Sequence, residues 1–154
     1  MTPPQRRVVE LPADGRAPSM ARRRVQEVVE PVAVPGMADL AALLVSELVG
    51  NAVLHATPPA TLTCTCGDSH VRLEVADSSP HPPHVGAAGL TDTGGRGMLL
   101  VDALSSRWGV EVTPDGKRVW VEIDLEDAAA YDRGDVIDLT ADDAVPAHRE
   151  HGTA

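Results

Sequence analysis

The strongest pattern of hydrophobic positions runs from residue 40 to residue 56 and reads LAALLVSELVGNAVLHA. Apolar residues cover almost the whole circumference of this segment at helical spacing, which predicts a mostly buried helix from about Met37 to about His55. The Thr57-Pro58-Pro59 run is expected to end the helix, because a residue that precedes proline is disfavoured in the helical conformation.

Three polar residues interrupt this apolar helix. Glu47, Asn51 and His55 are spaced i, i+4 and i+8, so their side chains form one slanting stripe. A carboxylate and an amide in a buried helix must be solvated, hydrogen-bonded or bound to a ligand. The helix alone leaves two interpretations open: the stripe lines a wet groove, or it coordinates a cation that carries an anionic ligand. Glu and Asn supply the oxygen ligands that Mg²⁺ prefers, and Mg²⁺ commonly accompanies phosphates.

Shorter periodic segments surround the central helix. Alternating apolar residues predict a strand at 6–11, a hairpin at 61–66 with 70–76, and a second hairpin at 108–113 with 117–125. Another helix is expected from an N-cap at Ser19 to about Glu30. Strands and helices do not alternate regularly, so a doubly wound parallel sheet is disfavoured. The order predicts an α+β fold, a two-layer sandwich with a mixed or antiparallel sheet covered by helices on one face.

A segment without periodicity, residues 77–93, separates the two hairpins and is expected to form a long loop of the kind that often serves as a lid. Asp77 begins it, with a carboxylate suited either to capping a turn or to accepting a hydrogen bond from a ligand amino group. Gly94-Gly95-Arg96-Gly97 ends it and opens a helix expected from Met98 to about Leu104. Glycines at a helix N-terminus let phosphate approach unpaired N–H groups, although they also suit a flexible joint.

Composition and charge narrow the classes of protein that fit. The 154 residues suffice for one domain with a hydrophobic core, and the formal net charge of −10 argues against direct binding of nucleic acid. No apolar run reaches the length of about 20 residues that spans a membrane, and the polar start lacks the apolar centre of a signal peptide. We therefore expect a cytoplasmic protein without membrane association. Residues 126–154 are acidic and aperiodic, and are expected to form a largely disordered tail.

The order of three features is more specific than any one of them. A helix bearing ExxxNxxxH precedes a hairpin that ends in Asp, and a lid and GGRG at the start of a helix follow. This order resembles the GHKL, or histidine-kinase-like, ATPase superfamily over residues 6–125. SELVGNAVLHA is similar to its N box, VADSSP to its first glycine box, and TGGRGMLLVDALSSRWGV to its second. The sequence of this second glycine box is most similar to those of anti-sigma-factor serine/threonine kinases and their ATP-binding relatives.

The resemblance implies a Bergerat-type ATP-binding fold and specific roles for individual residues. Asn51 would ligate Mg²⁺ and Glu47 would act as the general base. Asp77 would accept a hydrogen bond from the adenine amino group, which selects adenine over guanine. The second glycine box would hold the phosphates through Gly94, Gly95, Arg96, Gly97 and Met98. The side chain of Arg96 would add positive charge. His55 would have a structural role.

The implied function is an ATP- and Mg²⁺-dependent protein kinase that phosphorylates a serine or threonine of a small anti-sigma-factor antagonist, with a sigma factor as a further partner. One departure from the family pattern keeps an alternative open, because Asp77 is followed by Ser78, Ser79 and Pro80 with no glycine before Gly86. The alternative is an ATP-gated protein-binding module without phosphotransfer. A homodimer is compatible with the resemblance.

Overall fold

The computed structural model describes residues 3–32, 34–55, 60–78, 93–135 and 151–152, and its centre is a six-stranded sheet in the order β1-β2-β3-β5-β4-β6. Neighbouring strands are antiparallel except for β4 and β6, which are parallel. The strands are β1 (Gln5–Glu10), β2 (Thr61–Cys66), β3 (His70–Asp77), β4 (Arg107–Thr113), β5 (Gly116–Asp124) and β6 (His151–Gly152). The mixed sheet and both hairpins that the sequence predicts are confirmed.

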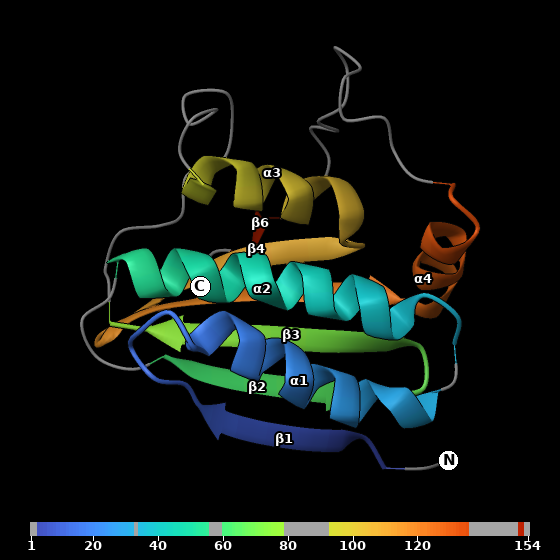
Figure 1. Cartoon of the computed structure of the whole chain (residues 1–154), viewed down its shortest axis with the longest axis horizontal. Helices are drawn as coiled ribbons and strands as arrows, with labels where there is room; N and C mark the ends of the chain where they lie inside the picture. The colour runs from blue at the N-terminus through green and yellow to red at the C-terminus, as the bar shows by residue number, and fades with distance from the viewer. Residues whose placement is uncertain (1–2, 33, 56–59, 79–92, 136–150, 153–154) are drawn as a thin grey trace.

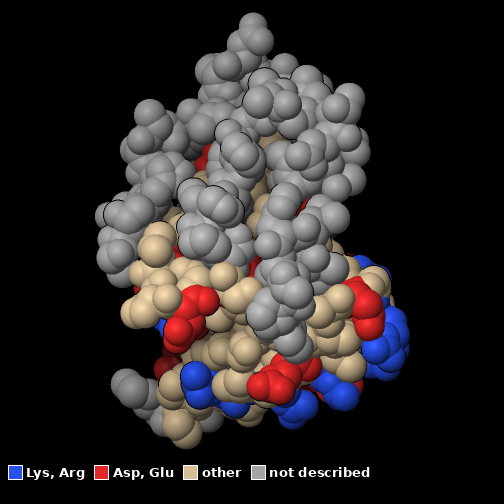
Figure 2. All heavy atoms as spheres, turned by 90° about the vertical axis from the view of Figure 1, so that its left-hand side faces the viewer, with Lys and Arg blue, Asp and Glu red and all other residues tan. Residues whose placement is uncertain are grey.

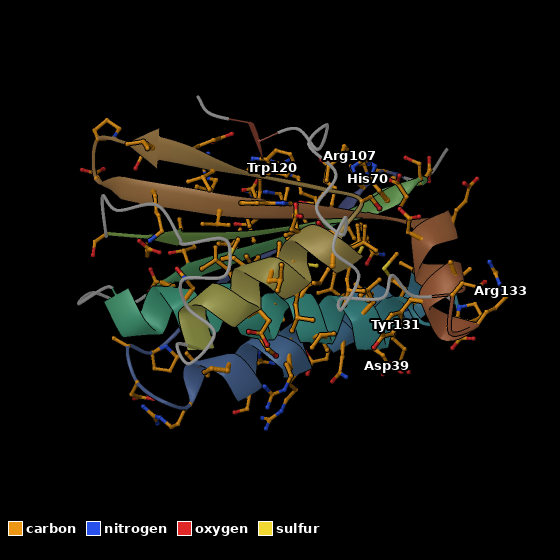
Figure 3. All side chains as sticks on the ribbon, turned by 90° about the horizontal axis from the view of Figure 1, so that it is seen from above. Asp39, His70, Arg107, Trp120, Tyr131 and Arg133 are labelled. Atoms are coloured by element: carbon orange, nitrogen blue, oxygen red, sulfur yellow. The ribbon has the colours of Figure 1, made fainter. Side chains whose placement is uncertain are left out.

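Three helices cover one face of the sheet, as expected, and Figure 3 shows the helical layer and the strand layer one above the other. The central helix α2 lies between α1 and α3 and crosses the middle of the sheet (Figure 1). The helices are α1 (Ala17–Val29), the 3₁₀ turn η1 (Glu30–Val32), α2 (Met37–His55), α3 (Thr93–Leu104) and α4 (Leu125–Asp132). The α+β, two-layer fold class is therefore confirmed.

The core fills the space between the two layers and is built from aliphatic side chains. On β3 every second residue is buried, and the same alternation on β5 points Val119, Val121 and Ile123 toward the helices. The opposite face of the sheet carries charged side chains. There Arg72 lies 4.4 Å from the ring centre of Trp120, and its guanidinium donates to Glu122 at 2.9 Å. One face of the sheet is thus the core and the other is polar.

Two helix starts differ from the sequence prediction. Helix α1 begins at Ala17 with Arg16 as its N-cap, three residues before the predicted cap at Ser19. The hydroxyl of Ser19 donates to the Arg16 carbonyl instead, and Pro18 fits the first turn, where its missing N–H is not needed. Helix α3 begins at Thr93, so residues 94–97 form its first turns and do not precede it.

The expectation of a disordered tail from residue 126 is wrong at its start, because residues 125–132 form helix α4. Ala128 is fully buried there. Gly36, with φ of +84°, leaves room for α4: a Cβ on Gly36 would come within 2.4 Å of the Ala128 carbonyl oxygen. Close backbone packing against the start of α2 therefore supports a helix that has no clear periodicity of its own. The rest of the expected tail lies outside the described residues, apart from β6.

Among the described helices, none is both long enough and apolar enough to cross a bilayer.

Candidate functional site

The polar stripe on α2 lies at its buried surface. Asn51 is 6% exposed and Glu47 is half-buried, while the side chain of His55 lies outside the description. Glu47 has an interaction partner in the fold. No hydrogen bond joins the side-chain amide of Asn51 to another residue within the described ranges. Among the described residues only one Asp102 oxygen is both enclosed and without a partner, so the Asn51 amide is open to its surroundings and has hydrogen-bonding capacity left for a ligand.

Asp77 is the last residue of β3 and points to the helix-covered face of the sheet. Directly opposite it, at the start of β5, is Lys117. The Lys117 ammonium nitrogen lies 3.0 Å from Asp77 Oδ1 and 2.9 Å from Oδ2, and both side chains are 1% exposed. Asp77 therefore belongs to a buried ion pair, and it has at least one further interaction in the fold.

Gly116 allows the two strands to come close enough for this pair. A Cβ on Gly116 would lie 2.0 Å from the Asp77 carbonyl oxygen and 2.6 Å from the Ser78 Cα. Any side chain at this position would push the end of β3 away from the start of β5. The glycine thus fixes the register in which Asp77 and Lys117 face each other.

The glycine cluster begins α3, and Met98, which follows it, is fully buried. The side chains of residues 93–97, including Arg96, are outside the description, as are residues 79–92 of the expected lid. At the other end of α3, Asp102 accepts a hydrogen bond of 2.8 Å from the Trp108 indole, while its second oxygen has no partner within the described part of the chain. This bond holds α3 against β4.

All these features come together at one end of the molecule. The C-terminal half of α2, the end of β3, the start of β5 and the N-terminus of α3 lie on the left side of Figure 1. Figure 2 looks at this end, where Arg side chains are interspersed with Asp and Glu side chains among the described residues, since the one lysine of the chain is buried. Within the part of the chain that is described, no three His, Cys, Asp or Glu side chains are grouped as a metal site.

Lys117 is a residue of the site that the sequence interpretation missed, although two signals were available. The chain contains no other lysine, and twelve arginines supply the rest of its basic side chains. The alternation that buries Val119, Val121 and Ile123 also places Lys117 on the buried face of β5. A lone lysine in phase with a hydrophobic face is a signal of a buried charge, and buried lysines are rare unless paired.

A family model for the histidine kinase-like ATPase domain matches residues 11–123 of the chain. The chain belongs to this family. The match runs from the residue after β1 to the next-to-last residue of β5, and the resemblance to the superfamily is confirmed.

Two proteins illustrate the relationship. An uncharacterised protein of Streptomyces coelicolor, SCO4941, is 45% identical over 67 residues, which is 42% of this chain and 64% of that protein. The crystal structure of the RsbU and RsbW domains of Rv1364c from Mycobacterium tuberculosis matches with a TM-score of 0.59 and 22% identity. That match covers 79% of this chain and 32% of the Mycobacterium chain, and it supports the fold.

Proposed function

We propose that the chain binds ATP with Mg²⁺ and transfers phosphate to a serine or threonine hydroxyl of a small anti-sigma-factor antagonist. The observation that carries the proposal is Asn51, a residue only 6% exposed whose side-chain amide has no hydrogen bond within the described ranges and is open to a ligand. It belongs to the C-terminal half of α2, which lies at the same end of the fold as the N-terminus of α3. Membership of the histidine kinase-like ATPase family and the sequence of the second glycine box support the same function.

The residues present fit a nucleotide that arrives with its cation. The amide oxygen of Asn51 is a suitable Mg²⁺ ligand from the protein, and the phosphate oxygens of the nucleotide would supply further ligands. The glycines at 94 and 95 lie in the first turn of α3, where backbone N–H groups have no partner within the helix and are open to phosphate, and where the helix dipole also favours negative charge. Mg²⁺ neutralises phosphate charge when bound, and this is a main requirement of phosphoryl transfer.

Glu47 lies one helical turn before Asn51, so both side chains lie along the same stripe of α2. Its half-buried carboxylate is suited to accept the proton of the attacking hydroxyl, which makes it the general base of the proposed reaction. Lys117 and Asp77 lie on the helix-covered face of the sheet, at the start of β5 and the end of β3, and would face the base of the nucleotide.

The proposal is tested by titration calorimetry with ATP, with and without Mg²⁺. Mg²⁺-dependent binding is expected for the wild type and is expected to weaken at least tenfold in Asn51→Ala. The matched control is Ser46→Ala on the same helix, because Ser46 lies off the stripe. Its hydroxyl donates a hydrogen bond to the Ala42 carbonyl and accepts one from the Arg22 guanidinium. Equal ATP affinity for Asn51→Ala and Ser46→Ala would contradict the assigned role of Asn51. Absence of ATP binding by the wild type would reject the function.

A second candidate is an ATP-gated binding module without phosphotransfer. It is favoured by the engagement of Asp77 with Lys117 and by the absence of glycine directly after Asp77. The two candidates separate when the protein is incubated with Mg-ATP and candidate antagonist proteins. Phosphoserine or phosphothreonine in the antagonist, detected by mass spectrometry, supports the kinase, whereas ATP-dependent antagonist binding without modification supports the module.

A further inference from the structure

The buried pair of Lys117 and Asp77 changes what the base site can recognise. A lone buried carboxylate offers only acceptors, so it suits the 6-amino group of adenine and opposes the 6-oxo group of guanine or hypoxanthine. The Lys117 ammonium has three N–H donors, of which at most two are used on the Asp77 oxygens at 3.0 Å and 2.9 Å, so one donor is left for a ligand beside the carboxylate. The site therefore presents a donor and an acceptor side by side.

Purines of both kinds match such a pair. The edge of adenine places the amino donor at position 6 next to the acceptor N1, whereas the edge of guanine or hypoxanthine places the oxo acceptor at position 6 next to the N1–H donor. Either order can be satisfied by one carboxylate and one ammonium. With only a carboxylate, a 6-oxo base would leave buried polar groups unpaired, and mismatches of this kind reduce binding of the wrong ligand by about 10⁴-fold in sites built for one pattern.

We propose that Lys117 is a specificity-determining residue that makes this base site accept 6-oxo purine nucleotides as well as ATP. The inference rests on the proposed function, since it concerns the same nucleotide site. It also revises the sequence expectation that Asp77 alone selects adenine over guanine. Three observations carry it: the ion pair, its near-complete burial, and the register enforced by Gly116.

Burial keeps the ammonium in place as part of the site. Asp77 and Lys117 are held opposite each other on neighbouring strands, not on a loop. Swinging Lys117 out of the site would break an ion pair whose side chains are both 1% exposed, which is strongly unfavourable. The donor is therefore present whenever a base reaches Asp77.

The first experiment compares the affinities of ATP, GTP and ITP for the wild type in the presence of Mg²⁺. ITP has the 6-oxo group without the 2-amino group, so it isolates the contact assigned to Lys117. The three affinities are expected to agree within tenfold. A preference for ATP over ITP of more than tenfold would overturn the inference while leaving the proposed function intact. Absence of binding by all three nucleotides would overturn both.

The second experiment repeats the comparison on Lys117→Met, which keeps an unbranched side chain but removes the donor. Binding of ITP and GTP is expected to fall at least tenfold relative to ATP. The matched control is Arg118→Met, which removes a cation from the next position on β5, where Arg118 faces the polar side of the sheet and pairs with Glu111. The ATP-to-ITP ratio of the control should equal that of the wild type. An unchanged ratio in Lys117→Met would overturn the inference.

A direct readout does not depend on folding of the variant. Because the chain contains one lysine, protein labelled with ¹³C at lysine Cε gives a single side-chain signal in a carbon–proton correlation spectrum. Saturating ITP and saturating ATP are both expected to shift this signal, since either base would contact the ammonium group. A signal that moves with ATP but stays in place with saturating ITP would contradict the role of Lys117.

Discussion

Removing one member of the buried Lys117–Asp77 pair is expected to destabilise the fold strongly. Lys117→Met leaves the Asp77 carboxylate in the interior without the ammonium group that is 2.9 Å away. At an effective dielectric constant of about 20, two unit charges at this distance attract each other by about 6 kcal/mol. Desolvation of both ions offsets part of this attraction, and single-partner removal from buried pairs costs about 3–5 kcal/mol.

The loss is measurable by urea denaturation followed through tryptophan fluorescence, since Trp108 is buried in the native state. For a chain of this size, 1 kcal/mol corresponds to about 2–4 °C in Tm, so a drop of about 6–20 °C is expected in thermal unfolding. The control is Arg133→Met. Arg133 pairs with Asp135 at 3.0 Å, but the two side chains are 63% and 62% exposed. The control should change the free energy of unfolding by no more than about 0.5 kcal/mol.

The double variant Lys117→Met with Asp77→Leu completes a double-mutant cycle, in which its stability is compared with those of the two single variants and the wild type. It places two apolar side chains opposite each other and leaves no unpaired charge, so it should be more stable than either single variant. A loss below about 1 kcal/mol for Lys117→Met would refute the reasoning, because this is the value of a surface pair. Additive losses in the double variant would refute it as well, because they would show that the two charges do not interact.

Three further predictions concern separate parts of the fold. Gly116→Ala should lower the free energy of unfolding by more than about 1 kcal/mol in the same denaturation assay, because its Cβ would lie 2.0 Å from the Asp77 carbonyl oxygen. Gly67→Ala is the control and should be tolerated, because the atom nearest to its Cβ would be 3.6 Å away. Glu47→Gln should retain ATP affinity within about twofold while phosphotransfer falls by about 10²-fold or more; unchanged transfer would exclude Glu47 as the base. Burial opposes ionisation of Glu122, but hydrogen bonds from Arg107 and Arg72 outweigh it and lower the pKa of Glu122. Its ionised form therefore stabilises the fold fully above the unfolded pKa of about 4.3 and progressively less as pH falls below that value, so the stability gap between wild type and Glu122→Gln should narrow in acid.

Local periodicity was sufficient to predict most of the fold. Alternation on β3 and β5 reports one buried and one polar face, and the apolar circumference of α2 gives its bounds from Met37 to His55. Periodicity and local motifs failed to predict the elements whose position is determined by tertiary contacts. Helix α4 is stabilised by packing of its backbone on Gly36, and the N-cap at Arg16 has none of the side-chain chemistry that marks most caps. Neither feature has a period or a motif.

The candidate site shows the same division between local and long-range information. The sequence identified Asn51 and Asp77 because each belongs to a local motif, whereas the pairing of Asp77 with Lys117 joins residues 40 positions apart on strands of different hairpins. Two predicted hairpins do not specify which strand of the second one lies beside β3, and only β5 in the observed register brings Lys117 to Asp77. The partner of a carboxylate decides whether it presents acceptors alone or an acceptor next to a donor. In the base site proposed above, selection would therefore depend on the strand register, and on the backbone approach at Gly116 as much as on Asp77 itself.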